Sequence, residues 1–507
     1  MKLGIDFGTT RTLVACADRG NYPVVSFVDD EGDAHEHVPS VVADDGGRLR
    51  YGFDALAAAR QGAQLVRSFK RALASADVTG ATPVRVGTLE VPMLELLTGY
   101  LTHVREALRT RSNAPKKASA DPTAAVAVPA HAHGAQRFIT LEAFRAAGFD
   151  VTALLNEPSA AGFEYTHRQE RTVTARRTRV VVYDLGGGTF DASLVKVDGG
   201  HHDVLATAGD NRLGGDDFDE ALLALACARG GLDTAALAPP VRAALLDQCR
   251  DAKERITPQA RRVSLDVSAA GGAEVVVTVE ELYGACTPLV ERTMAAMAPL
   301  LRGLDAGDDA LTDIAGIYLV GGGSGLPLVA RVLKERFGRR VHRSPYPAAS
   351  TAIGLAIAAD GALGFSLADR FSRCFGVFRE RDGGRALTFD PIFLPDTAQP
   401  QGKAAVLVSR RYRAAHNLGH FRFVECSRVD EAGEPVGDVM PFGDVLFPFD
   451  PALRARTDLD HVPVERCQQG PDVEERYLID PAGLVEVQIE DTATGFSRSY
   501  RLGRAAR

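Results

Sequence analysis

Apolar segments of strand length alternate with amphipathic segments of helix length along residues 1–360. The runs "KLGID", "AAVAVP", "RVVVYD" and "IAGIYLV" are typical of buried strands. The stretches "AQRFITLEAFRAAG" and "LPLVARVLKERFG" have helical periodicity, and each ends on a glycine. This alternation predicts an α/β architecture for the first 360 residues.

The pattern changes after residue 361. Residues 361–370 are expected to form an interdomain linker, and residues 371–507 contain short alternating segments such as "AAVLVSRRY", "HFRFVEC" and "LVEVQIED". Gly, Pro and Asp separate these segments and no long amphipathic helix interrupts them, which predicts an all-β domain of the sandwich type. The stretch near 429–475 is poorly periodic, and we expect a long loop or insertion there.

One supersecondary unit occurs twice in the first domain. "LGIDFGTTRTLVA" and "VVYDLGGGTFDASLV" share an apolar strand, an aspartate, a turn of small residues containing threonine, and a second strand. The repetition predicts two related lobes, although chance similarity of two short motifs is the alternative.

Composition restricts the class of protein further. The net charge of −8 argues against general binding to nucleic acid. No apolar run reaches the ~20 residues that span a bilayer, and the start "MKLGIDFGTT" does not resemble a signal peptide. Seven widely spaced cysteines without a CxxC motif are typical of reduced core residues, so we expect a cytoplasmic protein.

The glycine turns of the repeated unit suit phosphate, because backbone N–H groups can approach a ligand where no Cβ intervenes. A P-loop is excluded by the absence of GxxxxGK[ST], and a Rossmann turn is excluded because "GGGTFDASLVKV" continues as a strand. The aspartates before the turns, Asp6 and Asp184, require a cation beside phosphate, and Mg²⁺ suits oxygen ligands. The alternative is a pair of tight hairpins whose aspartates cap turns.

These motifs resemble those of the heat shock protein 70 family of chaperones. "GIDFGTT" and "YDLGGGTFDASL" are similar to the family's two phosphate motifs, "LLNEPSAAGFEY" to its connecting motif and "YLVGGGSGLPLV" to its adenosine motif. "SFKRAL", "VPAHAHGAQR" and "NRLGGDDFD" also match, and "RAAHNLGHFRF" and "LIDPAGLVEVQIED" resemble segments of its β-sandwich. The resemblance implies a two-lobed, actin-like ATPase domain with duplicated RNase H-like lobes, followed by an all-β sandwich.

The resemblance also implies the roles of individual residues. Lys70 would reach the γ-phosphate and the attacking water, Glu157 would orient that water or take its proton, and Thr189 would contact the γ-phosphate. Asp6 and Asp184 would hold hydrated Mg²⁺, with Asp184 also counted among the catalytic residues. The remaining ATP or ADP contacts would come from Gly8, Thr9, Thr10, Arg11, Gly186, Gly187, Gly188, Asp191, Lys253, Gly321, Gly322 and Gly323.

The adenine end departs from the family pattern. Gly325 and Glu254 stand where the family has two arginines that stack on the base, Gly323 replaces a serine, and Arg250 replaces a ribose-binding glutamate. Lys253 remains for the ribose. Two lost stacking contacts of about 0.5–2 kcal/mol each predict weaker or less base-selective nucleotide binding.

Coupling between the domains is implied by Pro129 and Arg137, which match the family's proline switch and its arginine, and by Phe365, Leu367 and Asp369 in the linker.

Other positions alter the expected regulation. Ala153 replaces the arginine that engages J-domain co-chaperones, so dependence on these and on nucleotide exchange factors is left open. The sequence stops where the sandwich is expected to end, which predicts no helical lid and fast substrate exchange. Phe442, Phe447 and Phe449 would replace part of the lid, dock on the other domain or form a satellite hydrophobic cluster.

Two functions are consistent with these features. The first is an ATP-dependent chaperone whose slow Mg²⁺-dependent hydrolysis controls binding of unfolded or extended peptide by the β-domain. The second is a nucleotide-dependent module that recognises one dedicated client protein without general folding activity. A sugar kinase or polyphosphatase lacks support, because "NEP" and "TFD" follow the chaperone pattern. No nucleic acid or membrane partner is expected.

Overall fold

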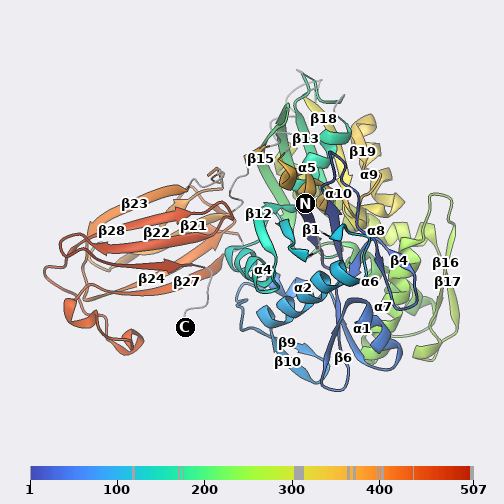
Figure 1. Ribbon diagram of the computed structural model, residues 1–507, viewed down its shortest axis with the longest axis horizontal. Helices are drawn as coiled ribbons and strands as arrows, with labels where there is room; N and C mark the ends of the chain where they lie inside the picture. The colour runs from blue at the N-terminus through green and yellow to red at the C-terminus, as the bar shows by residue number, and fades with distance from the viewer. Residues whose placement is uncertain are drawn as a thin grey trace.

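The computed structural model shows two α/β lobes and a separate β-sandwich (Figure 1). It describes residues 2–116, 120–169, 172–174, 176–301, 313–361, 366–368, 371, 373–395, 397–398, 400, 405–437 and 439–502. The predicted fold class, an actin-like ATPase fold followed by an all-β sandwich, is confirmed.

Lobe I is built on a five-stranded sheet with the order β12-β11-β1-β2-β5. The strands β1 and β11 are buried on both faces, because helices cover the sheet from either side, and this explains their nearly continuous apolar sequence. The elements of lobe I are β1 (Lys2–Phe7), β2 (Arg11–Cys16), β3 (Phe27–Val28), β4 (Ala34–His35), β5 (Val38–Pro39), β6 (Val41–Asp44), β7 (Leu49–Tyr51), α1 (Gly52–Arg60), β8 (Gln64–Arg67), η1 (Phe69–Ala74), β9 (Pro83–Val86), β10 (Leu89–Pro92), α2 (Met93–Thr110), β11 (Thr123–Val128), α4 (Gly134–Ala146), β12 (Asp150–Asn156) and α5 (Glu157–Arg168).

Lobe II repeats this plan in a sheet with the order β19-β18-β13-β14-β15-β20. In each lobe an antiparallel hairpin, β1–β2 or β13–β14, is followed by a parallel partner, β11 or β18. The elements are β13 (Arg179–Leu185), β14 (Phe190–Asp198), β15 (His201–Asp210), α6 (Gly215–Arg229), η3 (Thr234–Ala236), α7 (Pro239–Glu254), β16 (Arg262–Asp266), η4 (Ser268–Ala270), β17 (Glu274–Thr278), α8 (Val279–Leu301), β18 (Ile314–Val320), η5 (Gly322–Gly325), α9 (Pro327–Phe337), η6 (Gly338–Arg340), β19 (Val341–Arg343), α10 (Ser350–Asp360) and β20 (Ser366–Ala368).

The helices α5 and α10 pack closely against each other where the lobes meet. A Cβ at Gly354 would lie 1.8 Å from the carbonyl oxygen of Ala160, and a Cβ at Gly4 would lie 2.2 Å from the backbone of α10. Only glycine permits such backbone approach. The packing fixes α5, and therefore Glu157 at its first turn, relative to both sheets.

The linker contributes an edge strand to lobe II. Strand β20 pairs in parallel with β15, so that Leu367 lies opposite His202. His202 is fully buried, and its ring stacks on Phe163 of α5 at 4.6 Å. Burial lowers the pKa of His202 to about 4. The predicted linker residues Phe365 and Asp369 lie outside the described residues.

The C-terminal region forms two four-stranded antiparallel sheets with the orders β22-β21-β24-β27 and β23-β28-β29-β30. Aromatic side chains such as Phe375, Phe423 and Tyr477 fill the space between them. The elements are β21 (Cys374–Arg381), β22 (Ala386–Phe393), β23 (Val406–Arg413), β24 (Leu418–Cys426), β25 (Arg428–Val429), β26 (Pro435–Val436), β27 (Met440–Pro448), η7 (Pro451–Leu453), η8 (Leu459–His461), β28 (Asp472–Ile479), β29 (Val485–Asp491) and β30 (Phe496–Arg501).

The prediction of a long loop at 429–475 is wrong for its central part. Strand β27 runs through it and pairs with β24 over most of its length. Its phenylalanines Phe442 and Phe447, together with Phe449 just after it, belong to the main core of the sandwich and not to a satellite cluster. The proline and the glycine in "MPFGDVLFP" obscured the strand, because both residues are depleted in strands.

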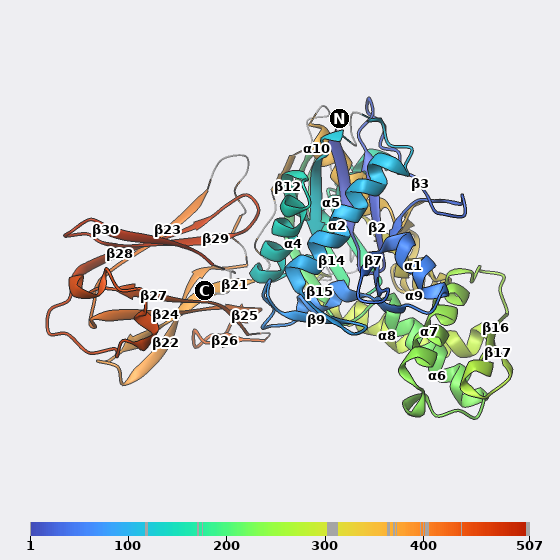
Figure 2. The same ribbon diagram turned by 60° about the horizontal axis from the view of Figure 1, so that its bottom comes forward.

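The sandwich contacts lobe I beside helix α4, and both ribbon views place it far from α7 and the β16–β17 hairpin (Figures 1 and 2). The carboxylate of Glu425 accepts a hydrogen bond from the Gly134 N–H at 3.0 Å. The ring of Phe442 covers Gly134 so closely that a Cβ there would lie 1.8 Å from it. Docking on the other domain, one of the three interpretations of the phenylalanine segment, therefore describes Phe442.

Among the helices that the structure describes, none is long and apolar enough to cross a membrane.

Candidate nucleotide site

Two matching hairpin turns face each other between the lobes. The Gly8 N–H donates to the carbonyl of Arg11 at 3.0 Å, and the Gly186 N–H donates to the carbonyl of Thr189 at 2.9 Å. A Cβ at Gly187 would lie 2.8 Å from the side chain of Thr10 in the opposite turn. The glycines thus allow the two turns to approach, which leaves their backbone N–H groups available at one place.

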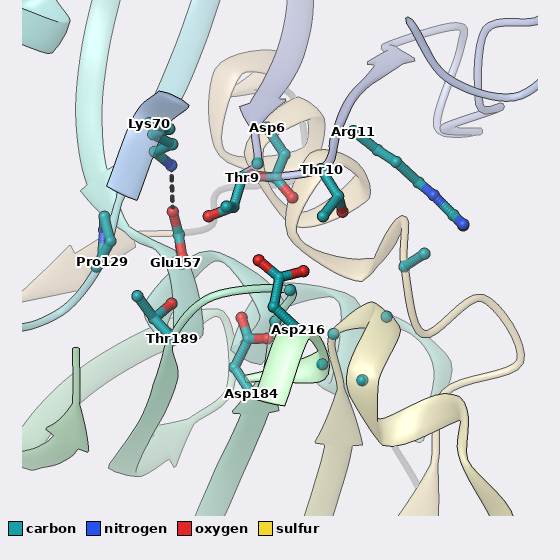
Figure 3. Close-up of a pocket in the computed structure, with 18 of the residues that line it drawn as sticks. Asp6, Thr9, Thr10, Arg11, Lys70, Pro129, Glu157, Asp184, Thr189 and Asp216 are labelled. Carbon is teal, nitrogen blue, oxygen red and sulfur yellow. Dashed lines mark hydrogen bonds and ion pairs between the residues drawn. The ribbon is translucent and has the colours of Figure 1, made fainter. Parts of the chain in front are cut away.

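The turns form one end of a pocket between the lobes, shown in Figure 3. At one side of the view lie Lys70, Glu157 and Thr189, while Arg11 extends in the opposite direction. Most of the predicted site residues line this pocket, namely Asp6, Gly8, Thr9, Thr10, Arg11, Lys70, Glu157, Asp184, Gly186, Gly187, Thr189, Lys253, Gly321, Gly322 and Gly323. Gly188 and Asp191, the other two predicted residues, are not in the pocket lining.

The carboxyl groups of Asp6 and Asp184 enter the pocket from opposite lobes. Burial and the nearby Glu157 raise the pKa of Asp6 to about 7, against the influence of Lys70. Burial, with Glu157, Asp6 and Asp191 nearby, raises the pKa of Asp184 well above its usual range. Clustered, buried carboxylates of this kind are stabilised in their charged form by a divalent cation, and their hard oxygen atoms fit Mg²⁺.

The buried Lys70 forms an ion pair with the partly buried Glu157 at 3.1 Å. The ammonium group of Lys70 also donates to the carbonyl of Phe7, which directly precedes the first glycine turn. Glu157 is placed by strand β12, which ends at Asn156, and by Pro158, which favours the start of helix α5 at this point. The pair joins the connecting motif to the "SFKRAL" motif, 87 residues apart in sequence.

Asp191 lies opposite Asp184 in the β13–β14 ladder. Its carboxylate accepts hydrogen bonds from the backbone of Ala130 and His131, while burial and Glu157 raise its pKa to about 7. Asp191 on lobe II therefore contacts the loop that follows Pro129 on lobe I. This contact connects lobe II to the segment that leads into α4.

The charged residues of helix α7 that line the pocket are already paired. Lys253 donates to the carbonyl of Gly215 at 2.7 Å and lies 2.7 Å from Asp219. Arg250 contacts Asp216 and Asp219 at 3.3 and 3.5 Å. Arg250, one of the altered positions, and the retained Lys253 thus belong to one ion-pair network on lobe II.

Sequence reasoning did not single out the contacts that close the cleft. Asp216 on lobe II accepts a hydrogen bond from Ser68 at 2.9 Å and lies 3.4 Å from Arg71, both on lobe I. Arg67 and Asp247 form a second ion pair between the lobes. The sequence did contain a signal for these contacts, because Ser68 and Arg71 lie within the motif "SFKRAL" and Asp216 lies within the motif "NRLGGDDFD".

The duplicated lobes, the facing glycine turns and the acidic pocket between them define a protein of the two-lobed, actin-like fold. The model of the Hsp70 protein family matches residues 102–369, which is more than half of the chain. The chain therefore belongs to the Hsp70 family.

Curated relatives support this assignment. The chain is 37% identical over 377 residues to a chaperone protein HscA homolog from Burkholderia multivorans, an alignment that covers 71% of this chain and 58% of the relative. It is 38% identical over 375 residues to a chaperone protein HscA homolog from Burkholderia thailandensis, with the same coverage. The alignments thus span less than two thirds of these relatives.

Proposed function

We propose that this chain is an ATP-dependent chaperone of the Hsp70 type, in which Mg²⁺-dependent hydrolysis of ATP to ADP and phosphate controls peptide binding by the β-sandwich. The observation that carries the proposal is the Lys70–Glu157 ion pair, 3.1 Å long and largely shielded from solvent, beside the two glycine turns. A cation and a carboxylate at this position are the groups that phosphoryl transfer to water requires.

The residues that line the pocket would have different roles according to their positions. The N–H groups of the two turns and the hydroxyl groups of Thr9, Thr10 and Thr189 bind phosphate oxygens. Glu157 orients water or accepts its proton, and Lys70 reduces the negative charge on the γ-phosphate. Asp6 and Asp184 would hold hydrated Mg²⁺, which would neutralise phosphate charge when it is bound.

A continuous path supports coupling between the site and the sandwich. Arg137 donates to the side chain of Asn156 at 2.7 Å, and Asn156 directly precedes Glu157. The same guanidinium donates to the carbonyl of Ala482 in the sandwich at 3.3 Å. A change at Glu157 on hydrolysis would therefore alter the docking of the sandwich through one side chain.

A measurement of steady-state ATP hydrolysis, with and without an unfolded peptide, tests this function. We expect Lys70→Ala and Thr189→Ala to reduce turnover by about 10²-fold or more, whereas the exposed Lys334→Ala on α9 should leave turnover unchanged. Peptide should stimulate the wild type and Lys334→Ala, and should not stimulate Lys70→Ala or Thr189→Ala. Absence of hydrolysis by the wild type would overturn the proposal.

A dedicated interaction module is the second candidate, and one feature of the sandwich favours it. Between the two sheets, Arg379 lies 2.6 Å from Asp390 and 2.7 Å from the fully buried Glu475, and Arg410 lies 3.1 Å from Asp390. This network joins the two sheets through charged groups, of which Glu475 is fully buried and the other three are partly exposed. Nucleotide binding without stimulation by any generic peptide would favour this candidate.

A further inference from the structure

Two cysteines of the β-sandwich face each other across a pair of strands. Cys374 is the first residue of β21, and it lies directly opposite Cys426, the last residue of β24, in their antiparallel ladder. All seven cysteines are free thiols. Cys16 is the only other cysteine in a strand that the structure describes, and it lies opposite Leu3. The register of the sandwich therefore brings together two thiols that are far apart in the sequence.

The spacing of the two strands suits a disulfide. Residues directly opposite in an antiparallel ladder have Cα atoms about 4.5 or 5.5 Å apart, depending on the hydrogen-bond pattern. Both values lie within the range of about 4.4–6.8 Å that a disulfide spans. The thiol groups already interact, because the Cys374 thiol donates a hydrogen bond to the sulfur of Cys426. A bond between them requires rotation of two side chains and no separation of the strands.

A short hairpin, formed by β25 and β26, covers the two thiols. The Cys426 thiol donates to the carbonyl of Arg428 at 3.3 Å, and Val429 packs against the small cluster that contains both cysteines and Phe389. The hairpin has only two register pairs, and one of them includes Pro435, which has no backbone N–H. Because isolated hairpins of this kind are marginally stable, local opening exposes the thiols while the rest of the sandwich stays folded.

The two thiols differ in reactivity. Burial, followed by the neighbouring Cys426 thiol, raises the pKa of Cys374 to about 12. Burial also raises the pKa of Cys426, but the hydrogen bond from Cys374 and the charge of Arg373 oppose this increase. Oxidants react with the thiolate form of cysteine. Cys426 is therefore the thiol that reacts first, and Cys374 is the adjacent thiol that completes the disulfide.

We propose that Cys374 and Cys426 are an oxidation site, at which hydrogen peroxide produces a reversible disulfide between β21 and β24. The Cys426 thiolate attacks one oxygen of the peroxide, the O–O bond breaks, and a sulfenic acid and hydroxide form. The sulfur of Cys374 then attacks the sulfenic sulfur, which forms the S–S bond and releases the second oxygen as water. Two thiols thus lose two electrons in total, and the peroxide is reduced to two molecules of water. An external dithiol reverses the reaction by exchange.

The disulfide would lie next to the contact that docks the sandwich on lobe I. Arg373 and Glu425, the residues before the two cysteines, form an ion pair at 3.6 Å, and their side chains are only 5% and 4% exposed. Glu425 also accepts the hydrogen bond from the Gly134 N–H. A covalent bond at this position prevents the start of β21, where the chain enters the sandwich, from separating from the strand that carries Glu425. Oxidation should therefore stabilise this end of the sandwich, because a cross-link that closes a long loop restricts the unfolded chain.

Peptide mapping of the full chain under non-reducing conditions tests the site. After treatment with hydrogen peroxide, we expect a peptide that links Cys374 to Cys426 and lacks the mass of two hydrogen atoms, and dithiothreitol should restore the two thiols. Hydrogen exchange at the amides of β21 and β24, followed by mass spectrometry, should slow by about tenfold or more in the oxidised protein. Cys374→Ser and Cys426→Ser should each lose both the linked peptide and the slower exchange.

The matched control is Cys467→Ser, since Cys467 is also in the sandwich but does not lie opposite a cysteine. This variant should form the same linked peptide and show the same change in exchange as the wild type. A disulfide between other cysteines, or separate oxidation of Cys374 and Cys426 to sulfinic acids, would overturn the assignment. Equal exchange at β21 and β24 in the reduced and oxidised proteins would overturn the stabilising effect. No nucleotide is present in these measurements, so their outcome is independent of the proposed function.

Discussion

The carboxylate of Glu425 in the β-sandwich accepts a hydrogen bond from the backbone N–H of Gly134 on lobe I, at 3.0 Å. Gly134 is the first residue of helix α4, whose free N–H groups and dipole favour a negative charge at this end. The two residues are 291 positions apart in sequence, so the contact joins the domains directly. Gly134 lies five residues after Pro129, and the loop between these two residues contains the backbone groups that Asp191 contacts.

Substitutions at this contact should uncouple the domains. Glu425→Ala removes the acceptor, and Gly134→Ala introduces a Cβ that clashes with Phe442, so each should weaken docking by about 1–3 kcal/mol. Limited proteolysis near the linker and small-angle scattering would detect a more open arrangement. Glu486→Gln, which alters an exposed pair with Arg501 within the sandwich, is the control and should leave both measurements unchanged.

Magnesium binding should depend on pH near neutrality. Burial raises the pKa of Asp6 to about 7 and raises that of Asp184 well above its usual range, so protons compete with a cation for these carboxyl groups as the pH falls. Because the cation binds only the ionised form, its affinity should increase as the pH rises from 6 to 8, with release of protons. Calorimetry in buffers of different ionisation enthalpy measures this release, and a pH-independent affinity would contradict the assignment.

Because the two glycine turns lie close together, a larger side chain in one turn should weaken nucleotide binding. Gly187→Ala places a Cβ 2.8 Å from Thr10, so the turns must separate, and we expect nucleotide affinity to fall by about tenfold. Gly284→Ala is the control, because its Cβ meets no atom within 4 Å in helix α8. This control should bind normally and gain up to about 1 kcal/mol in free energy of unfolding, since alanine favours helix over glycine. Equal loss of binding in both variants would contradict the geometry.

Contacts across the cleft should slow nucleotide release. Arg71→Ala and Ser68→Ala each remove a bond from lobe I to Asp216, so release of a fluorescent ADP in stopped-flow measurements should accelerate by about three- to tenfold. Higher ionic strength should reduce the effect of Arg71→Ala, because its partly exposed ion pair is screened. Arg109→Ala, which alters an ion pair within helix α2, should have no effect on release.

Much of the architecture follows from local pattern. The apolar strands, the helices that end on glycine and the repeated aspartate–glycine turn predicted two α/β lobes, and the structure has the same turn hydrogen bond in both copies. Strand β27 was not predicted, because its proline and its glycine interrupt the alternation of apolar and polar residues. Its low intrinsic strand propensity is offset by its pairing with β24.

The candidate site was likewise predicted only in part from the sequence. Sequence alone predicted which residues are available: the glycines and aspartates from their turn motifs, and Lys70 and Glu157 from the resemblance to the family. It did not show that Lys70 and Glu157 pair, that Asp216 bridges the lobes or that Arg11 meets Glu254, because each contact joins segments far apart in the chain. Such contacts depend on how the two lobes and the sandwich pack together, which only the tertiary structure decides. Glycines let backbone segments from different parts of the chain come close, and this packing sets the distances between the charged groups.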